Sequence, residues 1–364
     1  MKKLYPLLSV LFLISVGISQ NKVNINNLVK YGDKYFKEND DVPYDGIVFD
    51  MSKETGNKTI QFRMINGLKN GSYQEWYSNG KPKTKGEYIN DDSTGLWIWW
   101  YENGQKGHEE NYKDGIFDGL STSWYENGQK RYEGTFKDSK LDGLWIGWYE
   151  NGQKYWEINY KDDKVNGLLT EWYENGQKRY EGTFKDSKLD GLLTEWYENG
   201  KKKFFKNYKD DKVNGLLTEW YENGKKKVEG TFKDGKRHGL STMWYENGQK
   251  QSEITFKNGL EDGFSTTWYE NGQKERENTF SIFSHQGKLI SMTDGLQTQW
   301  DNNGNIESKW VSVRGGDFWT IYYSEEGETE RWFSHRYFDL IKEEFWDSEK
   351  YLKDWDGEIP KIGQ

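Results

Sequence analysis

Tryptophan recurs at an interval of 24 residues along most of this chain. The sequence around each tryptophan is nearly the same, and a representative copy runs from Gly215 to Asp234. A further copy, centred on Trp300, follows an eight-residue insertion between Phe280 and Gly295. A fixed period of this length indicates a tandem-repeat protein in which each unit contacts only its neighbours. The evenly spaced tryptophans are Trp76, Trp100, Trp124, Trp148, Trp172, Trp196, Trp220, Trp244 and Trp268.

A second period of 48 residues lies over the first. Residues 125–172 and 173–220 are identical at 40 of 48 positions, which indicates that the array grew by duplication of pairs. Clear units run from about residue 71 to residue 304, and a less regular one follows before Gly327, which makes roughly ten to twelve units.

Each unit is expected to form a β-hairpin. Asn-Gly between strand-forming residues, as at residues 223–224, is the strongest short-range hairpin signal, because both residues of a type I′ turn need positive φ. A two-residue turn there places Trp220 opposite Lys227, with a cation over an aromatic ring. The second strand is expected to end in a longer polar turn, residues 234–239, that returns the chain to the next hairpin.

Side-chain alternation divides the first strand of each hairpin between two faces. One face of this strand carries Leu216, Thr218 and Trp220, and the other carries Leu217, Glu219 and Tyr221. Phe232 of the second strand has two possible positions. A simple register places it on the Tyr221 face, whereas a bulge at Gly230 brings it beneath Trp220 to build a Leu-Trp-Phe core. We favour the bulge.

The chain is therefore predicted to be all-β, an elongated single-sheet antiparallel meander of tandem 24-residue hairpins with a short C-terminal helical cap. Residues 20–43 are polar and are expected to form an N-terminal cap, residues 44–327 the repeat array, and residues 328–364 the C-terminal cap and tail. From Ser334 to Trp355 the apolar residues follow a helical period, and this helix would cover the edge of the last strand.

Residues 1–19 have the pattern of a secretory signal peptide. Lys2 and Lys3 precede an apolar run, residues 4–16, and a small-x-small cleavage site follows at residues 17–19. The alternative is an uncleaved membrane anchor, although the run is shorter than the ~20 apolar residues that span a bilayer. We therefore expect an exported protein that is periplasmic, on the outer cell surface or secreted. The sequence has no cysteine, which excludes disulfides, thiolate metal sites and cysteine nucleophiles.

Composition and motifs give no indication of catalysis. The net charge of -9 is spread through all repeats, so nucleic acid is not an expected partner. The sequence has no phosphate-binding loop, dinucleotide fingerprint or Gly-x-Ser-x-Gly elbow, and its four histidines lack metal-ligand spacing. Residues 138–143 resemble a calcium loop only faintly, because they lack the closing glutamate of an EF-hand. We expect a non-enzymatic protein with no catalytic residue, no cofactor and no metal.

Positions at which one unit departs from the others are candidates for specificity, while the shared tryptophan and leucine are expected to be scaffold. The informative departures introduce large aromatic side chains, and an exposed aromatic patch commonly marks a binding surface. The alternative is that these rings cover gaps in a thin sheet, as Trp156 would cover Gly147 directly across the strand pair. The candidate partner-binding residues are Trp97, Trp99, Trp145, Tyr155, Trp156, Phe204 and Phe205.

The segments Trp-Tyr-Glu-Asn-Gly-Gln-Lys and Glu-Gly-Thr-Phe-Lys-Asp-Gly-Lys, followed by Gly-Leu, resemble the MORN repeat in its bacterial variant, over about residues 44–327. Bacterial proteins of this kind are often antitoxin or immunity partners of a secreted toxin, and eukaryotic MORN proteins are associated with membrane lipids and scaffolding. The resemblance implies a protein partner, with a toxin as one candidate, and no catalytic residue. The signal peptide departs from a cytoplasmic antitoxin, so a periplasmic or surface target is expected. A glycan or membrane surface of the cell envelope is the alternative partner, because Trp and Tyr stack on sugar rings and rest among lipid headgroups.

Overall fold

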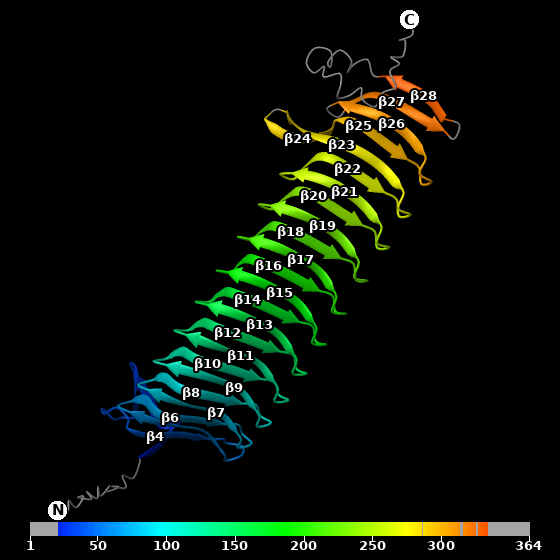
Figure 1. Ribbon diagram of the computed structural model, residues 1–364. Helices are drawn as coiled ribbons and strands as arrows, with labels where there is room; N and C mark the ends of the chain where they lie inside the picture. The colour runs from blue at the N-terminus through cyan, green and yellow to red at the C-terminus, as the bar shows by residue number, and fades with distance from the viewer. Residues whose placement is uncertain (1–20, 286, 314–315, 325–326, 334–364) are drawn as a thin grey trace, which may run out of the picture. The chain divides into compact units, whose positions relative to one another are not determined.

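The computed structural model describes residues 21–285, 287–313, 316–324 and 327–333. The chain divides into two compact units, residues 1–141 and 142–364. Both consist almost entirely of β-strands, and most strands pair antiparallel with the next strand in the chain (Figure 1). The predicted all-β antiparallel meander of tandem hairpins is confirmed. The expected signal peptide and C-terminal helix lie outside the described residues.

Unit 1 begins with short elements that cover its first hairpin. A parallel strand, β1, pairs with β4, so that Val23 lies opposite Val48. A separate hairpin of β2 and β3 is tied to the array through the backbone N–H of Tyr35, which donates to the carbonyl of Gly67 at 3.0 Å. The elements are β1 (Lys22–Asn24), the 3-10 turn η1 (Ile25–Asn27), β2 (Leu28–Tyr31), β3 (Lys34–Lys37), β4 (Gly46–Met51), β5 (Lys58–Ile65), β6 (Leu68–Trp76), β7 (Pro82–Ile89), β8 (Asp92–Trp100), β9 (Lys106–Lys113), β10 (Ile116–Trp124) and β11 (Lys130–Lys137).

A cluster of buried hydrophobic residues lies in unit 1. The N-terminal elements bring aliphatic residues onto the first strands of the array, and rings from β6 and β8 extend this core along the sheet. The segment that precedes the array, polar as it is, therefore contributes the residues that close one end of the sheet. The cluster consists of Val23, Tyr44, Val48, Phe62, Met64, Tyr73 and Trp97.

Unit 2 repeats the same hairpin with little variation. Strand β12 begins at the end of unit 1, and β28 extends the sheet to Phe333, which places residues 328–333 in a strand rather than in a tail. The strands are β12 (Lys140–Trp148), β13 (Lys154–Lys161), β14 (Lys164–Trp172), β15 (Lys178–Lys185), β16 (Lys188–Trp196), β17 (Lys202–Lys209), β18 (Lys212–Trp220), β19 (Lys226–Lys233), β20 (Lys236–Trp244), β21 (Lys250–Lys257), β22 (Leu260–Trp268), β23 (Lys274–His285), β24 (Lys288–Thr293), β25 (Gly295–Trp300), β26 (Ile306–Val313), β27 (Gly316–Ser324) and β28 (Gly327–Phe333).

The turn at Glu-Asn-Gly differs from the predicted type I′ turn. In the turn after β18, Gly224 has a φ of +90° while Asn223 keeps a negative φ, and the N–H of Gly224 donates to the carbonyl of Tyr221 at 2.8 Å. This is a three-residue loop, a type I turn followed by a left-handed glycine. It pairs Trp220 with Lys226 instead of Lys227, and a bulge restores the predicted pairing of Glu219 with Val228. The predicted Trp220–Lys227 pair is therefore wrong.

The tight type I′ turn occurs at the other end of each hairpin, where the sequence predicted a longer loop. Asp234 and Gly235 both have positive φ, 50° and 80°, and Lys233 pairs directly with Lys236. The N–H of Gly235 also donates to the carbonyl of Val213 in the preceding repeat at 2.9 Å. Successive turns along this edge are thus hydrogen-bonded to each other.

The favoured position of Phe232 is also wrong. Phe232 pairs with Gly215 in an unbroken register, so it shares the face of Leu217 and does not lie beneath Trp220. A register shift does occur beyond Gly230, but it lies between β19 and the following strand β20, where Gly239 has a φ of +88°. Trp220 is half-buried, and the most buried position beside it is the small Thr218. Unit 2 therefore has no continuous Leu-Trp-Phe core among its described residues.

Candidate functional site: an exposed aliphatic row

In six consecutive repeats of unit 2, from β12 to β22, the leucine or phenylalanine that follows the glycine in mid-strand is exposed, whereas the equivalent Leu296 in β25 is half-buried. The six exposed side chains are between 37% and 72% exposed, although they lie in the middle of strands. Successive members are two strands apart, which separates them by roughly 10 Å. We call them the aliphatic row; in unit 2 it consists of Leu144, Leu168, Leu192, Leu216, Leu240 and Phe264.

The residue that follows each member of the row points to the opposite face and is more buried. Leu217 is 8% exposed, against 37% for Leu216. The second position varies among the repeats, whereas the first is leucine or phenylalanine throughout unit 2. The expectation that the shared leucine is scaffold is therefore wrong. The varied second position is the more buried one. Comparison of the repeats pointed to the wrong residue because a repeated exposed side chain looks the same in sequence as a repeated buried one.

A ladder of charges and rings accompanies the aliphatic row on the same face. Lys226 pairs with Glu229 at 2.6 Å, and its Nζ also lies 5.6 Å from the ring centroid of Trp244 in the next hairpin. The same pattern recurs at Lys250, which binds Glu253 and lies over Trp268. Each lysine therefore links two repeats, and the side chains beside the row are already paired with one another.

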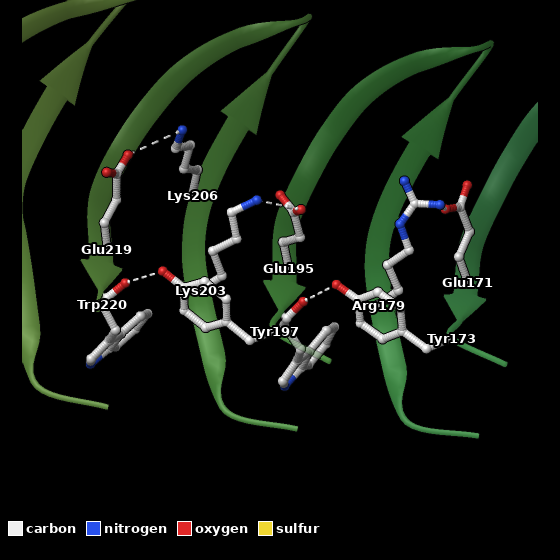
Figure 2. A network of polar contacts seen from close by, with 10 residues as sticks. Glu171, Tyr173, Arg179, Glu195, Tyr197, Lys203, Lys206, Glu219 and Trp220 are labelled. Atoms are coloured by element: carbon white, nitrogen blue, oxygen red, sulfur yellow. Dashed lines mark hydrogen bonds and ion pairs between the residues drawn. The ribbon is translucent and has the colours of Figure 1, made fainter. Parts of the chain in front are cut away.

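The opposite face carries a ladder of tyrosines. Tyr197 donates its hydroxyl to the backbone carbonyl of Trp220 in the next hairpin at 2.8 Å, and Tyr173 donates to Trp196 at 2.9 Å (Figure 2). Ion pairs lie above these tyrosines, with Lys203 at 2.9 Å from Glu195. These contacts join each repeat to the following one, so this face is occupied by structural interactions.

Loss of one tyrosine hydroxyl is expected to cost about 1 kcal/mol of unfolding free energy, because the Tyr197→Phe variant leaves the Trp220 carbonyl without its side-chain donor. Urea denaturation followed by tryptophan fluorescence measures the change. Tyr155→Phe is the control, because this exposed ring contacts Tyr149 but its hydroxyl has no hydrogen bond to a described residue. Equal losses in the two variants would contradict a structural role for the ladder.

Trp97 and Trp99 lie in unit 1. Trp97 is only 4% exposed and belongs to the core, so its assignment to an accessible aromatic surface is wrong. Its ring lies 5.5 Å from that of Tyr73 and stacks at 5.9 Å on Trp99. Trp99 is half-buried and also contacts His108. These two tryptophans extend the unit 1 core along the sheet.

Trp145, Trp156 and Tyr155 lie together in unit 2. Trp156 is directly opposite Gly147, as predicted, and stacks on Trp145 at 6.1 Å with an interplanar angle of 7°. A Cβ atom on Gly147 would lie 2.5 Å from Trp156 Cε2, so the indole covers the glycine closely. Tyr155 is the bulged residue of this hairpin and packs on Tyr149 at 4.8 Å. The geometry favours aromatic cover for Trp156, while a role of this cluster in binding stays a prediction.

Phe204 and Phe205 lie on opposite faces of β17. Phe204 pairs with Glu219 and lies under the ammonium of Lys206 at 4.2 Å. Phe205 pairs with Thr218 and contacts the ring of Trp220 at 5.7 Å. The five candidates in unit 2 therefore do not form one surface.

Burial raises the pKa of Tyr180 from 10.0 to about 12, with smaller contributions from the negative charges of Glu171 and Glu195. The neutral phenol is favoured in the folded chain, so its contribution to stability is complete below pH 10 and is lost as the pH rises from about 10 to 12. We expect the urea midpoint to fall across this window and to fall less steeply in Tyr180→Phe. Identical pH profiles for the two proteins would contradict this assignment.

Within the described ranges, no three His, Asp or Glu side chains come close enough together to hold a metal ion. In the same residues, no helix is long and apolar enough to cross a membrane.

The fold defines a tandem β-hairpin repeat protein. The sequence matches the MORN repeat variant in eight consecutive copies, and this part of the chain, residues 69–258, is therefore a MORN repeat array. The matched segments are 69–90, 93–114, 117–138, 141–162, 165–186, 189–210, 213–234 and 237–258. No curated protein sequence matches the chain.

Comparison with solved structures gives distant similarities. A structure described as TcdB2-TccC3 is 10% identical with a TM-score of 0.17, over 78% of this chain and 18% of the other. A structure of TcdB2-TccC3-Cdc42 gives the same identity and TM-score over 83% and 19%. A porin-like protein from Bacteroides uniformis is 10% identical with a TM-score of 0.16, over 68% and 92%. The chain spans less than a fifth of the first two, and TM-scores this low support no functional argument.

Proposed function

We propose that the chain is an exported, non-enzymatic scaffold that binds another protein along the aliphatic row of unit 2. The observation that carries this proposal is the exposure of six large apolar side chains at a regular interval on one face. Soluble proteins rarely leave an extended apolar surface uncovered unless it binds something.

The row offers a substantial share of the energy that specific binding needs. Full burial of a leucine contributes about 1.5–3 kcal/mol, and roughly half of that remains to be gained by a half-exposed side chain. Six such residues together offer several kcal/mol before the costs of association are subtracted. A partner that presents apolar side chains at the strand-pair spacing would gain most of this energy. The neighbouring lysines and glutamates form a polar border that excludes water from such an interface.

The class of partner follows from the family resemblance and from the N-terminal sequence. Bacterial proteins with this repeat include antitoxin and immunity partners, and residues 1–19 have the pattern of a secretory signal. We propose that the partner is a protein, with a toxin as one candidate, that acts in the periplasm or at the cell surface.

Affinity capture from the envelope and secreted fractions of the host tests this proposal. The bait is the chain from residue 20 onward, beside a variant with Leu192→Ser, Leu216→Ser and Leu240→Ser. These side chains are exposed, so the variant should fold normally. The control carries Arg179→Ser, Lys203→Ser and Lys227→Ser, three equivalent positions on the tyrosine face. We expect one stoichiometric protein with the wild type and the control, and its loss with the leucine variant.

Capture of the same protein by all three baits would contradict a role for the row. If no protein is captured by any bait, the protein-binding proposal fails, and binding to envelope glycans or liposomes becomes the next measurement.

A further inference from the structure

The eight-residue insertion changes one edge of unit 2. It lengthens β23 to 12 residues, adds β24, and extends the hairpin so that Phe280 pairs with Thr293 and His285 with Lys288. The Oγ of Ser291 in β24 donates to the carbonyl of Glu261 at 2.6 Å, which holds the extension against the preceding repeat. Figure 1 shows β24 projecting beyond the edge at which the tight turns lie. Elsewhere in unit 2, the hairpins from β12 to β22 lack this extension.

A groove of about 870 Å³ lies between the extension and the tight turns of two preceding repeats. Its basic side is formed by Lys233, Lys236 and Lys257, and its apolar side by Ile282 and Leu289. Leu289 is 60% exposed, which is unusual for an aliphatic residue that lines a concave surface.

The charge of the groove is positive, whereas the whole chain carries a net charge of -9. Three lysines and one aspartate, Asp234, line it, an excess of two positive charges. Lys257 has a partner in Asp262 at 3.6 Å. Lys233 and Lys236 face each other across the turn, and neither forms an ion pair with a described residue. Two like charges held opposite each other are destabilising, and an anionic ligand would relieve this repulsion.

We propose that this groove binds an acidic peptide segment of the protein partner, with carboxylates on the lysines and an apolar side chain against Ile282 and Leu289. The inference rests on the proposed protein-binding function and names the chemistry of a second contact. Because a basic edge lies beside an apolar wall, the groove favours a ligand that carries both negative charge and an apolar side chain. A simple anion would therefore bind less well.

Turns at equivalent positions, without the apolar wall, occur earlier in unit 2 and provide a control. Lys185 and Lys209 precede Lys233 and Lys257 by 48 residues and occupy the same positions in their strands. Any general attraction between lysines on this edge and an acidic peptide acts at both pairs, although the earlier pair is followed by Asp186, Asp210 and Asp211 and the later pair by Asp234 and Asn258. Only the later pair lies beside the extension.

The test measures anisotropy of a short fluorescein-labelled peptide in which leucine alternates with glutamate, added to the full mature chain. We expect saturable binding that weakens about tenfold in the variant Lys233→Glu with Lys257→Glu, because two attractive contacts become repulsive. The variant Lys185→Glu with Lys209→Glu should change binding less than about twofold. Leu289→Ser should weaken binding severalfold, and a peptide of leucine alternating with lysine should not bind.

Three results would contradict the proposed peptide site: no saturable binding of the acidic peptide, equal weakening of binding in the two lysine variants, or unchanged binding in Leu289→Ser. The proposed function is judged separately, because the variant in Leu192, Leu216 and Leu240 should bind this peptide normally. If that variant loses the captured partner and the wild-type chain does not bind the peptide, the groove proposal is refuted. The proposal that the aliphatic row binds a protein then still stands.

Discussion

Substitution of Trp97 by alanine is expected to destabilise unit 1 by about 3–5 kcal/mol, the cost of removing a large buried side chain from a packed site. Trp97 is 4% exposed and its ring contacts three tyrosines, at 5.5 Å from Tyr73, 4.9 Å from Tyr88 and 6.2 Å from Tyr112. It also covers Gly86 so closely that a Cβ there would lie 2.2 Å from the indole. No neighbouring side chain can fill the cavity without rearrangement of these rings. Urea denaturation followed by circular dichroism measures the loss.

Trp145 is the matched control for Trp97, because it occupies the same position 48 residues later. Trp145 is half-buried, whereas Trp97 is 4% exposed, so Trp145→Ala should cost less, about 1–2 kcal/mol. Similar losses in the two variants would mean that unit 1 has no core distinct from the repeats of unit 2.

Gly147→Ala is expected to cost about 1–3 kcal/mol, although the backbone at Gly147 does not require glycine. The cost arises because the new methyl group would lie 2.5 Å from Trp156 Cε2 and must displace the indole from its stack on Trp145. The effect should therefore depend on Trp156. In the background of Trp156→Ala, the same glycine substitution should be neutral or slightly stabilising, because alanine restricts the unfolded chain.

A double-mutant cycle on Gly147 and Trp156 measures this dependence as a coupling free energy. We expect a coupling of at least about 1 kcal/mol from urea midpoints of the four proteins. Additive effects would show that Trp156 does not cover Gly147 in solution, and would revive the interpretation of Trp156 as part of an exposed binding patch.

The repeat period and the hairpins could be predicted from the sequence, because the tryptophans recur at a fixed interval and Asn-Gly between strand-forming residues marks each hairpin. The pairing of Gly147 with Trp156 was predicted from a two-residue turn, and it is found because the bulge at Tyr155 compensates for the longer loop.

The sequence assigned the tight type I′ turn and the longer loop to the wrong ends of each hairpin. Local signals for the turn type were weaker than the contacts between repeats. Asp138 and Ser139 both adopt positive φ in a tight turn, a conformation that serine rarely takes. In the equivalent turn of unit 2, the N–H of Ser187 donates to the carbonyl of Val165 in the preceding repeat. No local sequence signal reports such a contact.

The aliphatic row was not predicted for a related reason. In Gly-Leu-Leu, either leucine could face the interior, and a thin sheet exposes apolar residues on both faces. The choice depends on the side chains that neighbouring strands bring to each face, and both pairings of β18 contain a register shift that the sequence does not show. The N-terminal core was missed because Val23 stands in a polar segment that gives no sign of packing on Val48.

Hydroxyl-radical footprinting read by mass spectrometry tests the exposed row most directly, because it reports the solvent access of individual side chains. In the chain alone, Leu192, Leu216 and Phe264 should be oxidised faster than Leu193 and Leu217. With the captured partner bound, the oxidation of the row should fall sharply, while Lys203 and its neighbours on the tyrosine face should keep their reactivity. Equal oxidation of Leu216 and Leu217 in the chain alone, or protection confined to the tyrosine face, would contradict the aliphatic row as the binding surface.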